Sequence, residues 1–291
     1  MRDDIKIWHY GLIARWWAEF NVGGADVEYF HNAIKQSGEP VLDAGCGTGR
    51  LLLPFLRSGI DVDGSDASSD MLDWCAKKAE EEGFSPNLYP QAMHELDLPR
   101  RDRTIIVCGS FGLGADRATD FEGLRRLHSH LEPGGVLIMD HHPPKSGTDY
   151  GEVVSENSKT PAPWPEQGDR RQTDDGVELE LRTRLIEINP TEKTATREIS
   201  VREFVDGVEV NHEVNSILIC GYSIPEVESM LNEAGFRDIL ITGSLEERPP
   251  QFEDELIFFK ATAYAIMAFI YSKVSKNSGT RSPMKSLTTS T

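Results

Sequence analysis

The stretch Val41-Leu42-Asp43-Ala44-Gly45-Cys46-Gly47-Thr48-Gly49-Arg50 decides the fold, because it has the pattern of a buried strand that enters a glycine turn and then a helix. Val41 and Leu42 supply the strand, and Asp43 stands at its carboxyl end. Glycine at every second position of the turn removes side chains, so that backbone can touch a ligand. The helix that begins near Arg50 presents free N–H groups to the same place. The pattern predicts a cofactor-binding turn.

The spacing of the glycines distinguishes two classes of cofactor. Gly45, Gly47 and Gly49 follow the pattern G-x-G-x-G, whereas a dinucleotide-binding turn has G-x-G-x-x-G. Asp43, two residues before the first glycine, would repel a pyrophosphate and attract a ligand that carries an amino group and a sulfonium. The turn therefore favours S-adenosylmethionine, and a nicotinamide-dependent oxidoreductase is the less favoured alternative.

Residues 43–49, D-A-G-C-G-T-G, resemble motif I of the class I S-adenosylmethionine-dependent methyltransferases. Residues 64–72, G-S-D-A-S-S-D-M-L, are similar to the G-x-D-x-S-x-x-M-L pattern of the same family. The resemblance implies that Asp66 holds the ribose hydroxyls and that Met71 packs near the adenine. Asp63 is the weaker candidate for the ribose, because it lies within the strand rather than at its end.

Further segments resemble the family as well. Gln91 replaces the acid of the family's acid-Ala pair, so that the backbone of Ala92 and Met93 would frame the adenine. Residues 131–138 resemble the L-x-P-G-G turn before strand five, and the aromatic residues of the amino-terminal helix, Tyr10, Trp16 and Trp17, resemble a lid over the cofactor. The resemblance covers about residues 40–142 and 222–261. It implies a cofactor-binding set of Tyr10, Asp43, Gly45, Cys46, Gly47, Asp66, Ala67, Met71, Ala92, Met93 and Cys108.

Helix and strand patterns alternate along the chain and predict an α/β fold with a doubly wound parallel sheet. Strands are expected at residues 41–44, 61–65, 87–92, 104–109 and 136–141, and helices at 10–20, 26–36, 49–58, 68–82 and 119–131. The resemblance adds a helix at 224–234 and a closing antiparallel hairpin at 239–242 and 256–259. Together these elements make a seven-stranded, Rossmann-like methyltransferase sheet with an antiparallel β insertion after strand five.

The expected organisation has four parts. Residues 1–39 form a helical lid, residues 40–142 and 221–262 form the cofactor-binding domain, residues 143–220 form the insertion, and residues 263–291 hold a C-terminal helix and a disordered tail. Within the insertion, residues 143–176 are expected to be a loop that orders on the ligand. Three strand-like runs with a hairpin at Asp206-Gly207 then predict a meander laid over the site. A dimerisation sheet in a homodimer is the alternative.

The acceptor side of the site is expected at the ends of strands four and five. Methyl transfer requires a nucleophile held about 3 Å from the methyl carbon in a dry cavity. Phe111 could close over the sulfonium or belong to the core, and Trp164 is the candidate side chain of the lid loop. His141, at the end of strand five, is the candidate base, because histidine can accept a proton at neutral pH. We expect no metal site, since no third converging ligand is identified beside His141 and His142.

Composition excludes some classes of partner. Thirty basic and forty-eight acidic residues give a formal net charge of −18, which disfavours nucleic acid and anionic membranes. The apolar run at residues 261–271 is about half the ~20 residues that span a bilayer, so no stable membrane span is expected and the run is predicted to pack as a last helix. Four cysteines without C-x-x-C spacing, and a start without a signal peptide, favour the cytoplasm.

The sequence therefore predicts an S-adenosylmethionine-dependent methyltransferase that acts on N or O of a small molecule. A non-catalytic binding protein with the same fold is the second hypothesis, because intact cofactor motifs do not require an acceptor pocket with a catalytic group. Binding of nicotinamide cofactor would favour the oxidoreductase instead.

Overall fold

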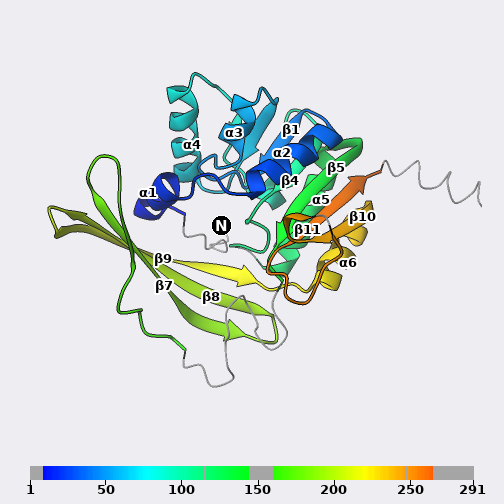
Figure 1. Cartoon of the computed structure of the whole chain (residues 1–291). Coiled ribbons are helices and arrows are strands. Elements are labelled where there is room, and N and C mark those ends of the chain that lie inside the picture. The colour runs from blue at the N-terminus through cyan, green and yellow to red at the C-terminus, as the bar shows by residue number, and fades with distance from the viewer. Residues whose placement is uncertain (1–8, 115, 144–159, 247, 265–291) are drawn as a thin grey trace, which may run out of the picture.

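The computed structural model describes residues 9–114, 116–143, 160–246 and 248–264. Its main element is a seven-stranded sheet in the order β3-β2-β1-β4-β5-β11-β10 (Figure 1). The strands are β1 (Val41–Ala44), β2 (Val62–Ser65), β3 (Leu88–Tyr89), β4 (Asp102–Val107), β5 (Leu131–His141), β10 (Phe236–Gly243) and β11 (Ile257–Ala263). Strands β1 to β5 pair in parallel, whereas β11 is antiparallel to both β5 and β10. The predicted doubly wound sheet with its closing hairpin is confirmed.

Alternating side chains of the central strands divide the core into two layers. Leu42 and Ile105 pack on the face covered by α5 (Arg117–His130) and α6 (Ile224–Ala234). Their neighbours Val41 and Ile106 pack on the other face with α2 (Asp26–Ser37), α3 (Leu52–Arg57) and α4 (Ser69–Glu81). Strands that are buried on both faces have apolar neighbours in sequence, as at Val41-Leu42 and at 105–107. The arrangement leaves the carboxyl ends of the parallel strands open as a site.

The insertion forms a second, antiparallel sheet of four strands rather than the predicted three. Its order is β6-β7-β8-β9, with β6 at Asp169–Gln172, β7 at Glu178–Asn189, β8 at Thr194–Val205 and β9 at Val208–Cys220. Strand β6 lies in the stretch that was predicted as loop, because its four residues are all exposed and so show no apolar alternation. The predicted hairpin between β8 and β9 is confirmed, and Asp206 and Gly207 both have positive φ.

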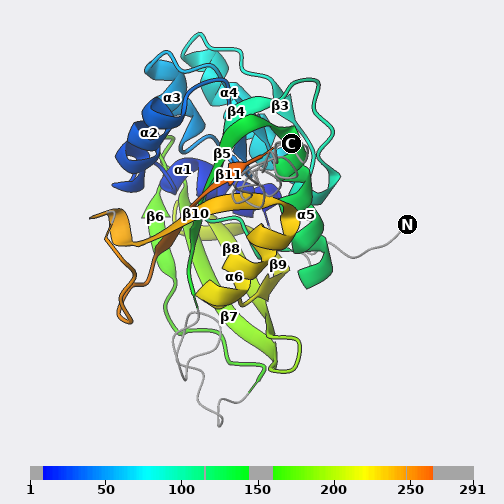
Figure 2. The ribbon, with the colours of Figure 1, turned by 90° about the vertical axis from the view of Figure 1, so that its right-hand side faces the viewer.

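Helix α1 (Gly11–Phe20) lies between the two sheets (Figures 1 and 2). Its apolar face, with Ile13 and Trp16, packs on Leu179 and Ile199 of the insertion sheet. Its amino-terminal end is joined to α4, because the Gly11 N–H donates to Asp70 at 2.8 Å. The helix therefore contacts both halves of the molecule.

The C-terminal part of the chain differs from the expectation in its first residues. Strand β11 continues to Ala263, so residues 261–263 are strand and not helix. Pairing with β5 explains this, since Ala261 lies opposite Leu137 and Thr262 opposite Val136. Residues 265–291, which include the rest of the predicted helix and tail, lie outside the described residues. In the part of the chain that the structure describes, no helix has the length and apolar character needed to cross a bilayer.

Candidate active site

A cavity of about 280 Å³ lies at the carboxyl ends of β1, β2 and β4. One part of its wall comes from the glycine turn after β1 and the loops after β2 and β3. The other part comes from the loop after β4, the first turns of α5, and α1. Side chains and backbone that line it include His9, Trp17, Asn21, Asp43, Gly45, Cys46, Gly47, Thr48, Arg50, Asp66, Ala67, Met71, Gln91, Ala92, Met93, His94, Cys108, Ser110, Phe111, Leu113, Thr119, Asp120 and Ile217.

Asp43 is a buried carboxylate at the base of the cavity, and only 2% of the residue is exposed. Its Oδ2 has no hydrogen-bond partner among the described residues. Burial raises the pKa of this carboxyl to about 7, although the nearby Arg50 guanidinium opposes the shift. A buried acceptor without a donor is costly. The site therefore offers this oxygen to a donor from a ligand, and a cation would suit it best.

The glycines of the turn have different tasks. Gly47 lines the cavity with φ of +55°, and a Cβ there would lie 3.1 Å from Cε of Met71. Gly49 is not among the residues that line the cavity, and a Cβ there would lie 2.8 Å from Sγ of Cys75 on α4. The lack of a side chain at Gly49 therefore permits the close approach of Cys75, whereas Gly47 borders the cavity.

Asp66 follows β2 and holds the glycine turn from the opposite side. Its Oδ2 accepts a hydrogen bond from Gly47 N at 2.9 Å, and its Oδ1 accepts one from Ser68 N at 2.8 Å. Ser68 caps α4, since its Oγ accepts from Met71 N at 3.2 Å. Burial raises the pKa of Asp66. The carboxylate therefore faces the cavity at the junction of β1 and β2.

Asp63, the weaker candidate from the sequence, lies away from the cavity. Its carboxylate accepts a hydrogen bond from Asn87 Nδ2 at 3.1 Å and pairs with Arg100 Nη2 at 3.1 Å. Arg100 Nε also pairs with Asp102 at 3.0 Å. Burial and the neighbouring Asp63 raise the pKa of Asp102 to about 6, although Arg100 opposes the shift. This group joins the amino-terminal ends of β2 and β4 and serves the sheet rather than the site.

The loops after β2 and β3 line one side of the cavity with Ala67, Met71, Ala92 and Met93, as predicted. Gln91 also lines it, but its Oε1 accepts a hydrogen bond from Asp97 N at 2.9 Å. The amide therefore stabilises its own loop. On this side the arrangement offers mainly apolar surface and backbone.

A network beside the cavity fixes the loop after β4. Arg50 donates to the two carboxylate oxygens of Asp26 at 2.8 and 2.7 Å and to Sγ of Cys108 at 3.0 Å. The buried Asp140 accepts from Gly109 N at 2.6 Å. Burial and the Asp140 charge raise the pKa of Cys108, so the thiol stays protonated. Cys108 lines the cavity as predicted, held in place by ionic neighbours.

Asp120 is the charged residue of the far wall that the sequence analysis missed. It lies in the first turn of α5, lines the cavity and is 9% exposed. Its Oδ2 accepts a hydrogen bond from the hydroxyl of the buried Tyr222 at 2.6 Å. Burial raises the pKa of Asp120 to about 7. Its spacing to Gly123 and Leu124, on the buried face of the helix, is a signal in the sequence that could have identified it.

Three predicted site residues are placed elsewhere. His141 is buried and is not among the residues that line the cavity; its Nε2 lies 2.6 Å from the backbone oxygen of Tyr222, and burial lowers its pKa. Trp164 stacks over Arg184 at 4.5 Å, on the face of the insertion sheet opposite α1. Tyr10 is exposed ahead of α1, where Trp17 lines the cavity instead. His141 and Trp164 are therefore not positioned as base and lid in this structure.

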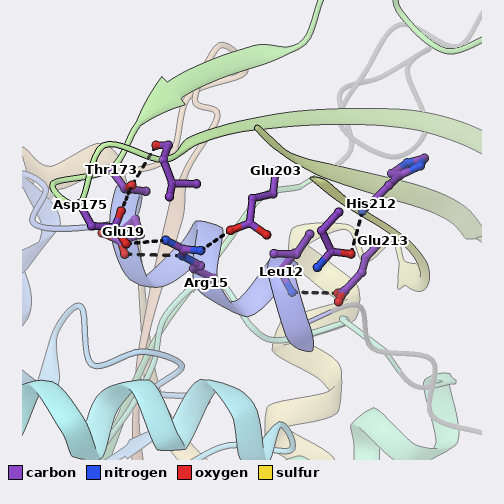
Figure 3. A network of polar contacts seen from close by, with 10 residues as sticks. Leu12, Arg15, Glu19, Thr173, Asp175, Glu203, His212 and Glu213 are labelled. Carbon is purple, nitrogen blue, oxygen red and sulfur yellow. Dashed lines mark hydrogen bonds and ion pairs between the residues drawn. The ribbon is translucent and has the colours of Figure 1, made fainter. Parts of the chain in front are cut away.

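The insertion reaches the cavity mainly through α1. Figure 3 shows the polar contacts between them: Leu12 N donates to Glu213 at 2.8 Å, and Arg15 pairs with Glu203 at 2.7 Å and with Asp175 at 3.0 Å. Among the described residues of the insertion, Ile217 lines the cavity directly. The meander therefore supports the helix that covers the site.

Comparison with known proteins identifies the class. Residues 41–135 match the family described as "Methyltransferase domain". The chain is 25% identical over 231 residues to a Geobacillus sp. (strain WCH70) protein named "Putative methyltransferase GWCH70_2453", covering 78% of this chain and 85% of that protein.

Solved structures show the same fold. The CcbJ methyltransferase of Streptomyces caelestis superimposes with a TM-score of 0.66 at 19% identity, covering 87% of this chain and 96% of that one. The sugar N-methyltransferase KedS8 of Streptoalloteichus sp. ATCC 53650 gives 0.64 at 18% identity, with coverage of 91% and 96%. The match over residues 41–135 thus identifies a methyltransferase domain, and the chain has the fold of solved S-adenosylmethionine-dependent methyltransferases.

Proposed function

We propose that this protein transfers a methyl group from S-adenosylmethionine to a nitrogen or oxygen atom of a small molecule. The binding of the methyl donor is supported by Asp43, a buried carboxylate in the cavity. One of its oxygens has no hydrogen-bond donor in the part of the chain that the structure describes. S-adenosylmethionine carries an ammonium group that can fill this position. A dinucleotide would instead bring a pyrophosphate, which the carboxylate repels.

The cavity residues divide between the parts of this cofactor. Asp43 would hold the amino group, the backbone at Gly45, Cys46 and Gly47 would border the methionine, and Asp66 would accept hydrogen bonds from the ribose hydroxyls. Ala67, Met71, Ala92 and Met93 would enclose the adenine, with Cys108 near the sulfonium. When bound, the cofactor supplies an electrophilic methyl group. The chain itself then has to orient the acceptor and exclude water, which Trp17 and α1 favour by covering the cavity.

A small acceptor is supported by three observations. KedS8 is named a sugar N-methyltransferase, and CalS10 of Micromonospora echinaspora, with a TM-score of 0.53, an amino pentose methyltransferase. The cavity is small and covered, and the net charge of −18 repels nucleic acid. The four cysteines are free thiols, which supports the cytoplasm as the proposed location. The oxidoreductase and the non-catalytic binding protein are not favoured.

Calorimetry and an activity assay test the proposal. S-adenosylmethionine and S-adenosylhomocysteine should each bind one site, and NADH should not bind. Incubation with methyl-labelled S-adenosylmethionine and a small-molecule cell extract should transfer label to a product. Absence of cofactor binding would refute the proposal, and binding without transfer to any product would favour the non-catalytic binding protein.

A further inference from the structure

Asp120 is a buried carboxylate in the cavity that forms no ion pair with a described residue, although the nearby charge of Arg117 lowers its pKa. Arg117, on the same helix, is engaged elsewhere: its Nη1 donates to the Gly221 carbonyl at 2.8 Å and its Nη2 to Glu226 at 2.8 Å. The close polar partners of Asp120 are neutral, namely the hydroxyl of Tyr222 and the thiol of Cys220. Aspartate is rarely buried without a paired cation. The ligand is therefore the natural source of the missing charge.

The acidic residues that line the cavity can be compared with the groups of the methyl donor that each would bind. Asp43, Asp66 and Asp120 are the acidic residues that line its described wall. The proposed function uses Asp43 for the ammonium of the cofactor and Asp66 for the ribose hydroxyls. Asp120 is left without a task. The one arginine that lines this wall, Arg50, is already paired with Asp26.

The position of Asp120 points to the acceptor. It lies at the start of α5 and is connected through Tyr222 to Phe111 in the loop after β4, whereas Asp43 and Asp66 follow β1 and β2. Phe111 packs against the Tyr222 ring with centroids 5.3 Å apart, and the Arg117 guanidinium lies over the same ring at 4.2 Å. The Asp120 carboxylate is buried beside them. A cationic group would gain strongly there, because water no longer screens the charge.

We propose that the methyl acceptor is a small amine that enters as an ammonium ion, and that Asp120, held by Tyr222, binds this group and accepts its proton. This inference rests on the proposed function and narrows its acceptor from N or O to an amine. In the step, the ammonium gives one proton to Asp120, and the nitrogen lone pair then forms the bond to the methyl carbon. The methyl–sulfur bond breaks, its electron pair stays on sulfur as a neutral thioether, and the proton on Asp120 passes to solvent.

The groups around Asp120 fit this role. Burial and the charge of Asp116 raise its pKa, whereas Tyr222, Cys220 and Arg117 lower it, and the result is a value of about 7. A carboxyl near the working pH is an efficient proton acceptor. The Tyr222 hydroxyl remains a donor, because burial and Asp120 raise its pKa. Tyr222 is therefore a positioning residue.

The test compares D120N with E122Q. Asn keeps the shape and the acceptor oxygen of Asp120 but loses its charge, and Glu122 is an exposed acid two residues further along α5 that pairs with Arg126. Each protein is incubated with methyl-labelled S-adenosylmethionine and a small-molecule cell extract, and the products are separated by cation exchange at acid pH. Binding of S-adenosylmethionine and S-adenosylhomocysteine is measured by calorimetry on the same samples.

We expect the parent and E122Q to place label in the retained amine fraction, and D120N to lower this transfer about 100-fold or more. Affinity for S-adenosylhomocysteine should stay within about twofold in D120N, which also shows that the variant is folded. Label in the unretained fraction, or unchanged transfer by D120N, would overturn the inference while leaving the proposed function intact. So would a loss of S-adenosylmethionine affinity in D120N, because Asp120 would then serve the cofactor. Absence of cofactor binding by the parent would refute the proposed function itself.

Discussion

Replacement of Asp43 by Asn tests the donor site and its dependence on pH. The change keeps the size of the side chain and removes the charge that is proposed to meet the amino group of S-adenosylmethionine. A hydrogen bond to a charged group contributes about 1.5–3 kcal/mol. The affinity of D43N should therefore fall by a factor of about 10 to 150.

The pH dependence follows from the pKa of Asp43, which burial raises to about 7 in the ligand-free protein. An ammonium ligand binds the ionised carboxylate, so the protein must release a proton when it binds below this pH. The fraction of protein with an ionised Asp43 is about one tenth at pH 6 and about nine tenths at pH 8. The cofactor should therefore bind about tenfold more weakly at pH 6 than at pH 8. In D43N this contribution to the slope should disappear.

The assay is titration calorimetry at pH 6, 7 and 8 in buffers that differ in their heat of ionisation, which reports the protons released. D73N, a change at an exposed acid on α4, serves as the control and should bind as the parent does. Equal affinity of D43N and the parent, with the same release of protons, would falsify the assignment of Asp43 to the amino group.

Four further substitutions, in three tests, separate the site from the scaffold. Gly47→Val should weaken cofactor binding at least about tenfold in calorimetry. Valine is strained at a φ of +55°, and its side chain would enter the cavity. An affinity equal to that of the parent would contradict the role of this turn. Asp66→Ala should weaken binding by at least about tenfold, while Asp63→Ala should leave affinity unchanged and lower only the melting temperature; equal losses of affinity in the two variants would refute the distinction. Arg100→Met should lower the free energy of unfolding by about 1–3 kcal/mol at pH 8, since the guanidinium is partly exposed and its loss leaves carboxylates without a counter-charge. The loss should be smaller at pH 5, because Asp102 is then largely protonated in the folded protein, where its pKa is about 6. Since this pKa is raised from the ordinary value of 3.8, the contribution of Asp102 to stability falls as the pH rises between these two values. A loss that is larger at pH 5 than at pH 8 in denaturant unfolding would exclude this explanation.

The sequence predicted the elements that local pattern controls. The apolar run at Val41, the glycines after it and the acid two residues earlier define a strand, a turn and a charge within ten residues. The distinction between Asp66 and Asp63 also depended only on position relative to a strand end. The structure places Asp66 at the cavity and Asp63 in an ion pair with Arg100.

The acceptor side depended on contacts between distant segments. Asp120 and Tyr222 are 102 residues apart and meet only because α5 and α6 cover the same face of the sheet. His141 has a side chain that can act as a base and lies at the end of β5, but its imidazole Nε2 interacts with the backbone oxygen of Tyr222. No local pattern shows which of two neighbouring side chains on a strand will be covered by a later segment.

The sequence by itself determined the class of fold, the order of helices and strands along the central part of the chain, and the donor side of the cavity. Each of these follows from periodicity, glycine conformation and charge over short distances in the sequence. The tertiary structure decided the position of α1 between the two sheets, the addition of the exposed strand β6 to the insertion sheet, and the hydrogen bond between Asp120 and Tyr222. These features arise from burial and hydrogen bonding between segments remote in the chain, and their energies depend on which surfaces meet when the chain folds.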